Sequence, residues 1–199
     1  MSGSGAWSGT VGAGLGAPAP TGGELFALIA AAAARRPAAA SGRWSGLLFL
    51  VGERRLLVPL AQVDLVLALP SALTPVPDSG RRMLGIANHQ GTLLPIFDLG
   101  VLLGLGAAVP GTAGRVLVVR RDGCPCGLGV SAVSAIRHCD ASALRAAPPG
   151  GSALLGPCVQ GAFDLDGERV PVLDLEPVSA ALLTGLAQVQ PDPESVQRW

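Results

Sequence analysis

Two Asp-Gly dipeptides, each set between two short apolar runs, constrain the fold of this chain more than any other feature. An Asp-Gly pair favours the two-residue turn of a β-hairpin, because both residues tolerate the positive φ angles that this turn requires. The dipeptides are Asp122-Gly123 and Asp166-Gly167, and the flanking runs are residues 115–121, 124–130, 159–165 and 169–173. Short runs separated by turn residues are typical of a many-stranded all-β barrel.

A further hairpin is predicted near the start of the same region. Residues 47–51 and 54–60 are apolar runs separated by Gly52-Glu53, and residues 62–69 form a third run that ends at Pro70. We expect these three strands to form a meander. The third run places apolar residues on both faces of a strand, namely Val63, Leu65, Val66, Leu67 and Leu69. This strand is therefore either buried on both faces or leaves apolar surface for a partner.

The composition excludes several classes of function. Of the 199 residues 49% are hydrophobic and 14% are charged, the formal net charge is zero, and none is lysine. Without a concentrated basic face, and with an aromatic content of 4%, the chain does not fit a nucleic-acid binder. Its four cysteines are too few for a disulfide framework at this length. Free cysteines fit a reducing compartment, so we expect the protein in the cytoplasm.

The two ends of the chain differ from its middle. We expect a Gly- and Ala-rich extension, one domain and a tail, at residues 1–42, 43–185 and 186–199. Good helix formers at 24–36, followed by Pro37, predict a short helix, and a second is predicted for residues 175–183, stopped by Gly185. Residues 1–23 lack the basic residues of a signal peptide, and no apolar run reaches about 18 residues. Neither secretion nor direct membrane insertion is predicted.

Residues 84–99 and 155–175 share a pattern. Each begins with Leu-Gly, contains a Gln-Gly pair that we take as a turn, and ends in a Pro-led apolar strand followed by Asp. The matched positions are Gln90-Gly91 and Gln160-Gly161, Pro95 and Pro171, and Asp98 and Asp174. Each Asp is placed to cap the next helix, because its carboxylate accepts hydrogen bonds from the amides of a first turn. The repetition predicts two small barrels, each closed by a helix.

The sequence LGIANHQGTLLPIFDL at residues 84–99 resembles the signature of the CheW family, usually a Gly, then Asn-Leu-Arg-Gly and Pro-Val/Ile-x-Asp-Leu. The resemblance extends over about residues 43–183 and includes GLGVSAV at 127–133 and VPVLDL at 170–175. It implies an all-β, CheW-like fold of two small five-stranded SH3-like or OB-like barrels with short helices. It also implies a non-enzymatic cytoplasmic adaptor, without cofactor, that couples a CheA-type histidine kinase to a methyl-accepting chemotaxis receptor.

The N-terminal extension, which ends in RWSG at residues 43–46, is similar to the PilI branch of the family. Members of that branch act in systems that control type IV pili and twitching motility. The residues expected to bind partners are Asn88, His89, Gln90 and Gly91 in the matched motif, and Val63 and Leu65 on the apolar third run. Those of the structural motif are Gly85, Pro95, Asp98, Leu99, Pro171 and Asp174.

Gln90 departs from the family pattern, which has Arg at this position. An Arg guanidinium forms a charge-assisted fork with a carboxylate, and a neutral amide cannot reproduce that contact. We expect the surface around Gln90 to recognise a different partner or to bind more weakly. A paralogue that has lost receptor binding is an alternative.

The cysteines suggest a second class of function, a metal or redox sensor. Cys124 and Cys126, with His138 and Cys139, could in principle hold a metal or form a redox pair. However, zinc motifs usually use a wider spacing and a second paired arm, which this sequence lacks. We therefore assign no metal, and we expect Cys158 to be a core residue.

No catalytic residue is assigned. His89 lies beside a Gly turn, but the sequence offers it no evident nucleophile with an oriented partner. Asp98 and Asp174 could form a carboxylate pair, yet each fits a helix cap better than acid-base catalysis.

Overall fold

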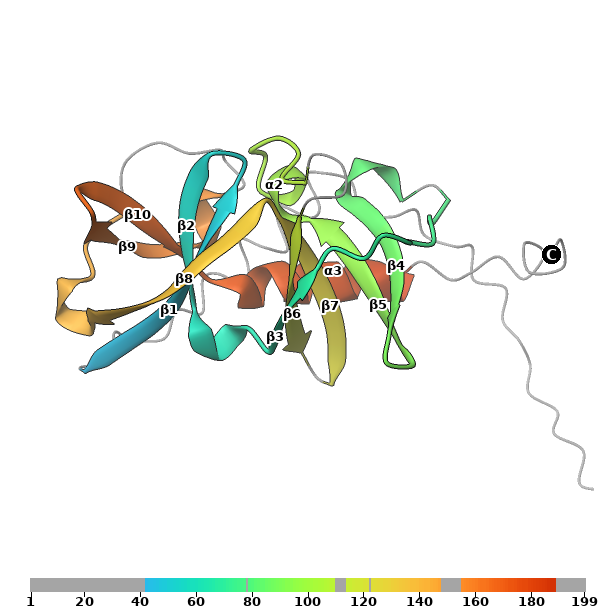
Figure 1. Cartoon of the computed structure of the whole chain (residues 1–199), viewed down its shortest axis with the longest axis horizontal. Coiled ribbons are helices and arrows are strands. Elements are labelled where there is room, and N and C mark those ends of the chain that lie inside the picture. The colour runs from blue at the N-terminus through green and yellow to red at the C-terminus, as the bar shows by residue number, and fades with distance from the viewer. Residues whose placement is uncertain (1–41, 78, 110–113, 122, 148–154, 189–199) are drawn as a thin grey trace, which may run out of the picture.

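Ten strands form two curved five-stranded sheets in the computed structural model, which describes residues 42–77, 79–109, 114–121, 123–147 and 155–188, with side chains as far as 182. The first barrel contains β1 (Arg43–Val51), β2 (Arg54–Pro59), β8 (Ala132–Asp140), β9 (Val159–Leu165) and β10 (Glu168–Leu173). The second contains β3 (Leu65–Ala68), β4 (Met83–His89), β5 (Thr92–Asp98), β6 (Arg115–Arg121) and β7 (Cys124–Val130). Figure 1 shows the two barrels side by side, so the predicted all-β, two-barrel fold class is confirmed.

Short helical segments connect the strands. The α-helices are α2 (Leu99–Leu102) and α3 (Leu175–Gln188), and the 3-10 turns are η1 (Leu60–Gln62), η2 (Gly80–Arg82), η3 (Ala141–Ala143) and η4 (Gly156–Cys158). α3 continues through Gly185, so the prediction that this glycine stops the helix was wrong. A single glycine costs a helix interior only about 1 kcal/mol and does not end it alone. The helix predicted at 24–36 lies outside the described residues.

The two barrels exchange strands. Strand β3 follows the β1–β2 hairpin in the chain but pairs with β6 of the second barrel, and β8 follows the β6–β7 hairpin but pairs with β1 of the first. The sheet orders are β8-β1-β2-β10-β9 and β3-β6-β7-β5-β4, with equivalent elements at equivalent places. The predicted meander of residues 47–69 was therefore wrong, because the third strand leaves its hairpin, and Gln62 belongs to η1 instead of a strand.

The predicted internal repeat is present, but its register differs. Hairpins β4–β5 and β9–β10 are each followed by a helix. The second strand of each hairpin pairs in parallel with a strand of the other hairpin in the same barrel, β5 with β7 and β10 with β2. Gly85 and Gly161 occupy equivalent positions, since each precedes an isolated bridge to a passing segment. Gln160 therefore lies inside β9, and the turn of this hairpin is Asp166-Gly167, with φ angles of 54° and 81°.

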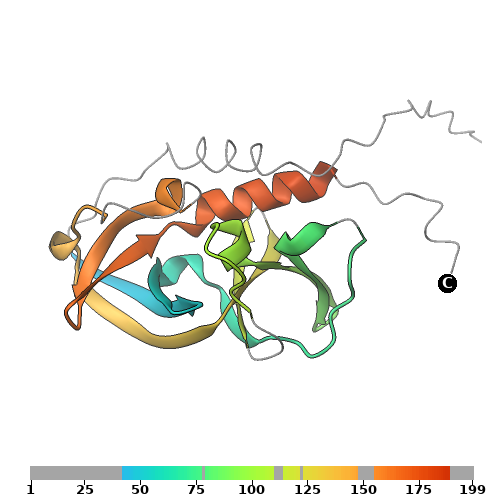
Figure 2. The same cartoon turned by 90° about the horizontal axis from the view of Figure 1, so that it is seen from above.

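The largest apolar core lies between the barrels. Leu48 points into the first barrel, whereas its neighbours Leu47 and Phe49 join residues of β6, β7, α2 and α3 in a shared core. Each barrel interior holds a smaller cluster, with Phe163 in the first and Ile96 in the second. Figure 2 shows α3 lying along both barrels. Because most apolar burial is shared, we expect the two barrels to unfold as one unit.

Candidate partner-binding surfaces

The tip of the β4–β5 hairpin presents an uncharged polar surface. His89 pairs with Thr92, which leaves Gln90 and Gly91 as a two-residue turn with φ angles of 52° and 83°. The amide of Gly91 donates to Asn88 Oδ1 at 2.9 Å, so the Asn88 side chain stabilises the turn. Asn88, Gln90 and Gly91 are exposed, and His89 is half-buried. The turn thus projects the Gln90 amide into solvent.

The hairpin tip also carries an apolar residue that the sequence interpretation did not single out. Leu93, the second residue of β5, is 67% exposed, whereas the next residue, Leu94, points into the second barrel. An exposed leucine after a polar turn gives no sequence signal, since strand alternation does not tell which face meets solvent.

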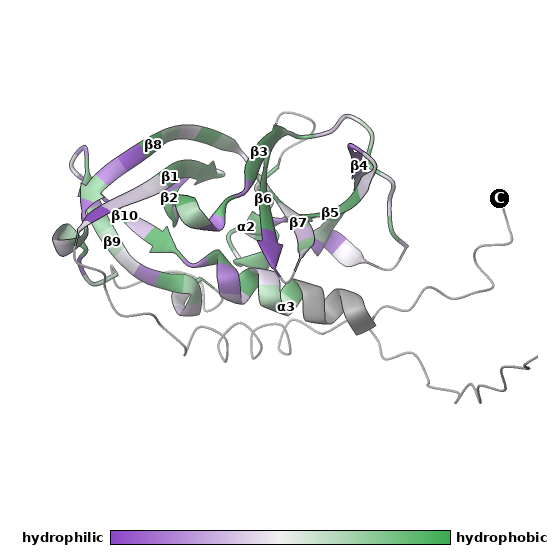
Figure 3. Cartoon of the chain, turned by 90° about the horizontal axis from the view of Figure 1, so that it is seen from below, coloured by the Kyte–Doolittle hydropathy of each residue, from purple (hydrophilic) through white to green (hydrophobic). Residues whose placement is uncertain are grey.

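Strand β3 forms an exposed apolar edge of the second sheet. Leu65 and Val66 are 41% and 37% exposed although they point to opposite faces, and Figure 3 shows the strand as largely hydrophobic. Val63, in contrast, is half-buried against the core between the barrels. Burial of this strand on both faces is therefore excluded. The hairpin tip and β3 belong to the two ends of the sheet order.

A side-chain link fixes the segment that leads into β3. Gln62 Nε2 donates to Asp174 Oδ1 at 2.8 Å, and the amide of Leu175 donates to Gln62 Oε1, also at 2.8 Å. Asp174 additionally accepts from the amide of Glu176 at 3.0 Å. The first turn of α3 and the crossing from the first to the second barrel are thereby joined. No local pattern indicates the role of Gln62, because the contact spans 112 residues.

Asp98 is the buried one of the two aspartates in the structural motif, whereas Asp174 is half-buried. Asp98 is only 2% exposed. Its Oδ1 accepts from the amide of Val101 at 3.0 Å, and this hydrogen bond caps the N-terminus of α2. The carboxylate also accepts from the amides of Ala108, at 2.9 and 3.1 Å, and Val109, at 3.3 Å. Asp98 therefore joins three backbone amides, and Leu99 after it is fully buried.

The residues considered for a metal or redox site do not converge. Cys126 and Cys158 are buried, Cys139 is half-buried and Cys124 is exposed, and His138 Nδ1 lies 2.8 Å from Ser45 Oγ. Within the described residues, no group of three or more His, Cys, Asp or Glu side chains is placed to hold a metal ion. Cys158 belongs to the core between the barrels, as predicted.

Thiol labelling at about pH 8 is expected to modify Cys124 rapidly and to leave Cys126 and Cys158 unmodified. Burial raises the pKa of both buried thiols to about 12, so they stay protonated and unreactive at that pH. Mass spectrometry of labelled native protein checks this, with Cys124→Ser removing the fast adduct and denatured protein labelling all four cysteines. Rapid labelling of Cys126 in the native protein would contradict the buried assignment.

These features define a two-barrel β domain with two distinctive surfaces, an exposed edge strand and an uncharged hairpin tip. Exposed apolar surface of this kind is typical of modules that bind other proteins. A family model described as CheW-like domain matches residues 45–182. The chain belongs to this family.

Individual relatives agree with this assignment. The chain is 34% identical over 120 residues to the protein PilI of Pseudomonas aeruginosa, covering 60% of this chain and 67% of that protein. It is 28% identical over 130 residues to the chemotaxis protein CheW of Rhizobium meliloti, covering 65% and 83%. The crystal structure of the scaffolding protein TtCheW from Thermoanaerobacter tengcongensis superposes with a TM-score of 0.59 at 21% identity, covering 71% of this chain and 90% of that one.

One further structural finding bears on the predicted absence of membrane insertion. None of the helices in the described residues is both long enough and apolar enough to cross a bilayer.

Proposed function

We propose that this chain is a non-enzymatic cytoplasmic adaptor that couples a CheA-type histidine kinase to a methyl-accepting chemotaxis receptor in a system controlling type IV pili and twitching motility. Membership in the CheW-like family supports the adaptor role, and the similarity to PilI supports the pilus system. The observation that carries the proposal is the exposed apolar edge strand β3, which leaves Leu65 and Val66 in solvent.

An edge strand with apolar side chains on both faces is an unusual feature for a monomer to leave uncovered. Such an edge offers unpaired backbone groups as well as apolar area, and native proteins normally protect it with charges, proline or a covering element. The four residues of β3 include no charge. A partner protein that buries this strand would remove its apolar area from water.

The second proposed contact is the hairpin tip at Asn88–Gly91. No residue from Met83 to Phe97 is Asp, Glu, Lys or Arg. This tip can therefore contact a partner through amide and imidazole hydrogen bonds and through Leu93, without an ion pair. We propose that its receptor has a neutral contact opposite Gln90, because an amide cannot form the charge-assisted fork with a carboxylate that an Arg forms.

Replacing Leu65 with Glu is expected to weaken capture of the kinase, the receptor or both by about tenfold or more, because a buried unpaired carboxylate opposes association. The test is a pull-down from the source cell with tagged protein and quantitative mass spectrometry of the bound proteins. Ala72→Glu adds the same charge at another exposed position and should leave capture unchanged.

The same experiment with Gln90→Arg tests the hairpin tip. The variant is expected to alter receptor capture and to leave kinase capture at the wild-type level. If the wild type captures the kinase but no receptor, and Gln90→Arg restores the receptor, the chain is a paralogue that has lost receptor binding. If the wild type captures neither partner, the proposed adaptor function is wrong.

A further inference from the structure

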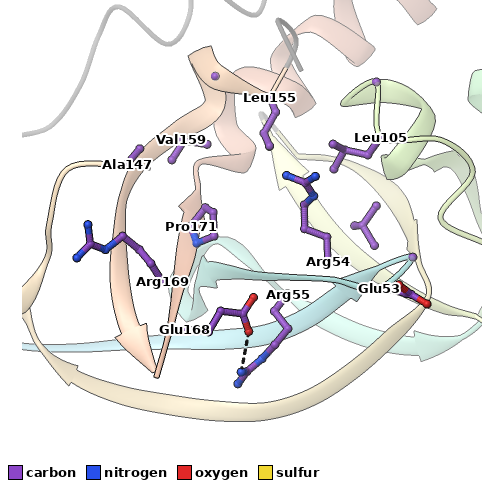
Figure 4. Close-up of a pocket in the computed structure, with 14 residues that line it drawn as sticks. Glu53, Arg54, Arg55, Leu105, Ala147, Leu155, Val159, Glu168, Arg169 and Pro171 are labelled. Carbon is purple, nitrogen blue, oxygen red and sulfur yellow. Dashed lines mark hydrogen bonds and ion pairs between the residues drawn. The ribbon is translucent and has the colours of Figure 1, made fainter. Parts of the chain in front are cut away.

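An open pocket lies on the first barrel at the end of β2 remote from η1 and β3. It encloses about 1100 Å³ between the β1–β2 turn, the loop after α2, and strands β9 and β10. Figure 4 shows its lining, and Figure 1 places the β1–β2 turn at the upper edge of the molecule and η1 with β3 at the lower edge. The pocket is therefore separate from the two surfaces proposed above.

The floor of the pocket is apolar. Leu155 and Val159 line it while only 3% and 6% exposed, and Leu105 and Pro171 add half-buried side chains. The lining therefore combines these apolar side chains with five charged ones.

Three arginines and two glutamates line the same pocket, but they differ in their partners. Arg55 Nη1 lies 3.0 Å from Glu168 Oε2, and Arg55 Nη2 lies 3.0 Å from Asp166, so the Glu168 charge is already matched. Arg169 is paired with Asp164 at 2.9 Å.

Arg54 is the third arginine of the lining and takes no part in these ion pairs. None of the ion pairs formed by the described residues includes it. In Figure 4 its guanidinium extends across the pocket towards Leu155 and Leu105, whereas the Glu53 side chain points away from it. Arg54 is exposed, so its guanidinium is free to donate two parallel hydrogen bonds to the two oxygens of a carboxylate.

We propose that this pocket binds an acidic peptide segment of a partner protein. One carboxylate of the segment pairs with Arg54, and an apolar side chain beside it packs on Leu105, Leu155 and Pro171. Since the pocket is remote from β3 and from the β4–β5 hairpin tip, the segment can bind while both of those surfaces are occupied. The domain then has a third binding site, for an acidic segment, on its first barrel.

The test uses a fluorescein-labelled peptide that alternates leucine with aspartate and glutamate, and a matched peptide with asparagine and glutamine in the acidic positions. Fluorescence anisotropy with the full chain should show binding of the acidic peptide alone, weakening as salt is raised. Arg54→Gln should weaken binding about tenfold or more, and Arg54→Lys less, because it keeps the charge and loses the paired hydrogen bonds. Arg81→Gln, at an exposed arginine of the second barrel, should have no effect.

Amide chemical-shift mapping locates the peptide independently of affinity. We expect shifts at Gly52, Arg54 and Leu105 on addition of the acidic peptide. The proposal is overturned if that peptide fails to bind at about millimolar concentration, if the neutral peptide binds equally well, or if the shifts fall on β3 or the β4–β5 hairpin. None of these measurements uses the kinase or the receptor, so their outcome is independent of the adaptor function.

Discussion

Asp98→Ala is expected to lower the free energy of unfolding by about 3–5 kcal/mol, a large fraction of the stability of a domain of this size. The substitution removes the acceptor for the amides of Val101, Ala108 and Val109 at once. A lost helix cap costs about 1 kcal/mol, and each buried amide left without an acceptor costs about 1–3 kcal/mol. Urea unfolding followed by circular dichroism measures the change, with an unaltered m-value as the sign of an unchanged unfolded state.

Asp174→Ala is the matched control, because Asp174 holds the equivalent position in the other half of the repeat. Its carboxylate accepts one backbone amide, that of Glu176, and the Gln62 side chain at a half-exposed site. We expect a loss of about 1–2 kcal/mol, typical of a helix cap. An Asp98→Ala variant no less stable than Asp174→Ala would show that the buried amides find other acceptors.

The sequence predicts one of the three amides that Asp98 holds. The cap of α2 follows from an Asp directly before a helix, which is a local rule. Ala108 and Val109 lie ten and eleven residues further on, and the chain reaches the carboxylate again only because the loop after α2 returns to it. No local pattern predicts such a return, so the cap was predictable and the buried network was not.

The same limit separates the strands from their pairing. The turns at Gly123, Asp166-Gly167 and Gly52 are local, and they predict three hairpins that the structure contains. The apolar run at residues 62–69 predicts β3 as a strand but does not say to which sheet it belongs, and β8 was not predicted. The exchange of both strands between the barrels is tied to the shared core, which depends on residues far apart in the chain. The exposed edge at Leu65 and Val66 follows from that exchange and was therefore left open by the sequence.

Gly161 shows how a correct repeat can carry a wrong register. Matching the two halves by Gln-Gly pairs equated Gly161 with Gly91, a turn residue. The structure instead equates Gly161 with Gly85, because each lies in a strand where a second segment passes closely. A Cβ at Gly85 would lie 2.7 Å from the carbonyl oxygen of Thr74, and one at Gly161 would lie 2.7 Å from that of Arg145. The repeated feature is thus a backbone crossing, which sequence comparison within one chain does not distinguish from a turn.

This crossing makes Gly85→Ala the second substitution with a large expected effect. Gly85 has a φ of 141°, which L side chains rarely adopt, and the added methyl group would press on the backbone of Thr74. Strain and overpacking together should lower the free energy of unfolding by about 2–4 kcal/mol. Gly161→Ala meets the same kind of backbone contact without the positive φ, so a smaller loss of about 1–3 kcal/mol is expected.

Gly156→Ala is the control for both glycine variants, since a Cβ there meets nothing within 4 Å and its effect should stay within about 0.5 kcal/mol. All three variants are compared by urea unfolding. If the loss in free energy of unfolding is largest for Gly85→Ala, smaller for Gly161→Ala and smallest for Gly156→Ala, the passing segments at Thr74 and Arg145 are fixed parts of the two barrels. Equal stability of Gly85→Ala and Gly156→Ala would mean that the segment around Thr74 moves away at little cost. Strand β4 would then be a second open edge of the second barrel, in addition to β3.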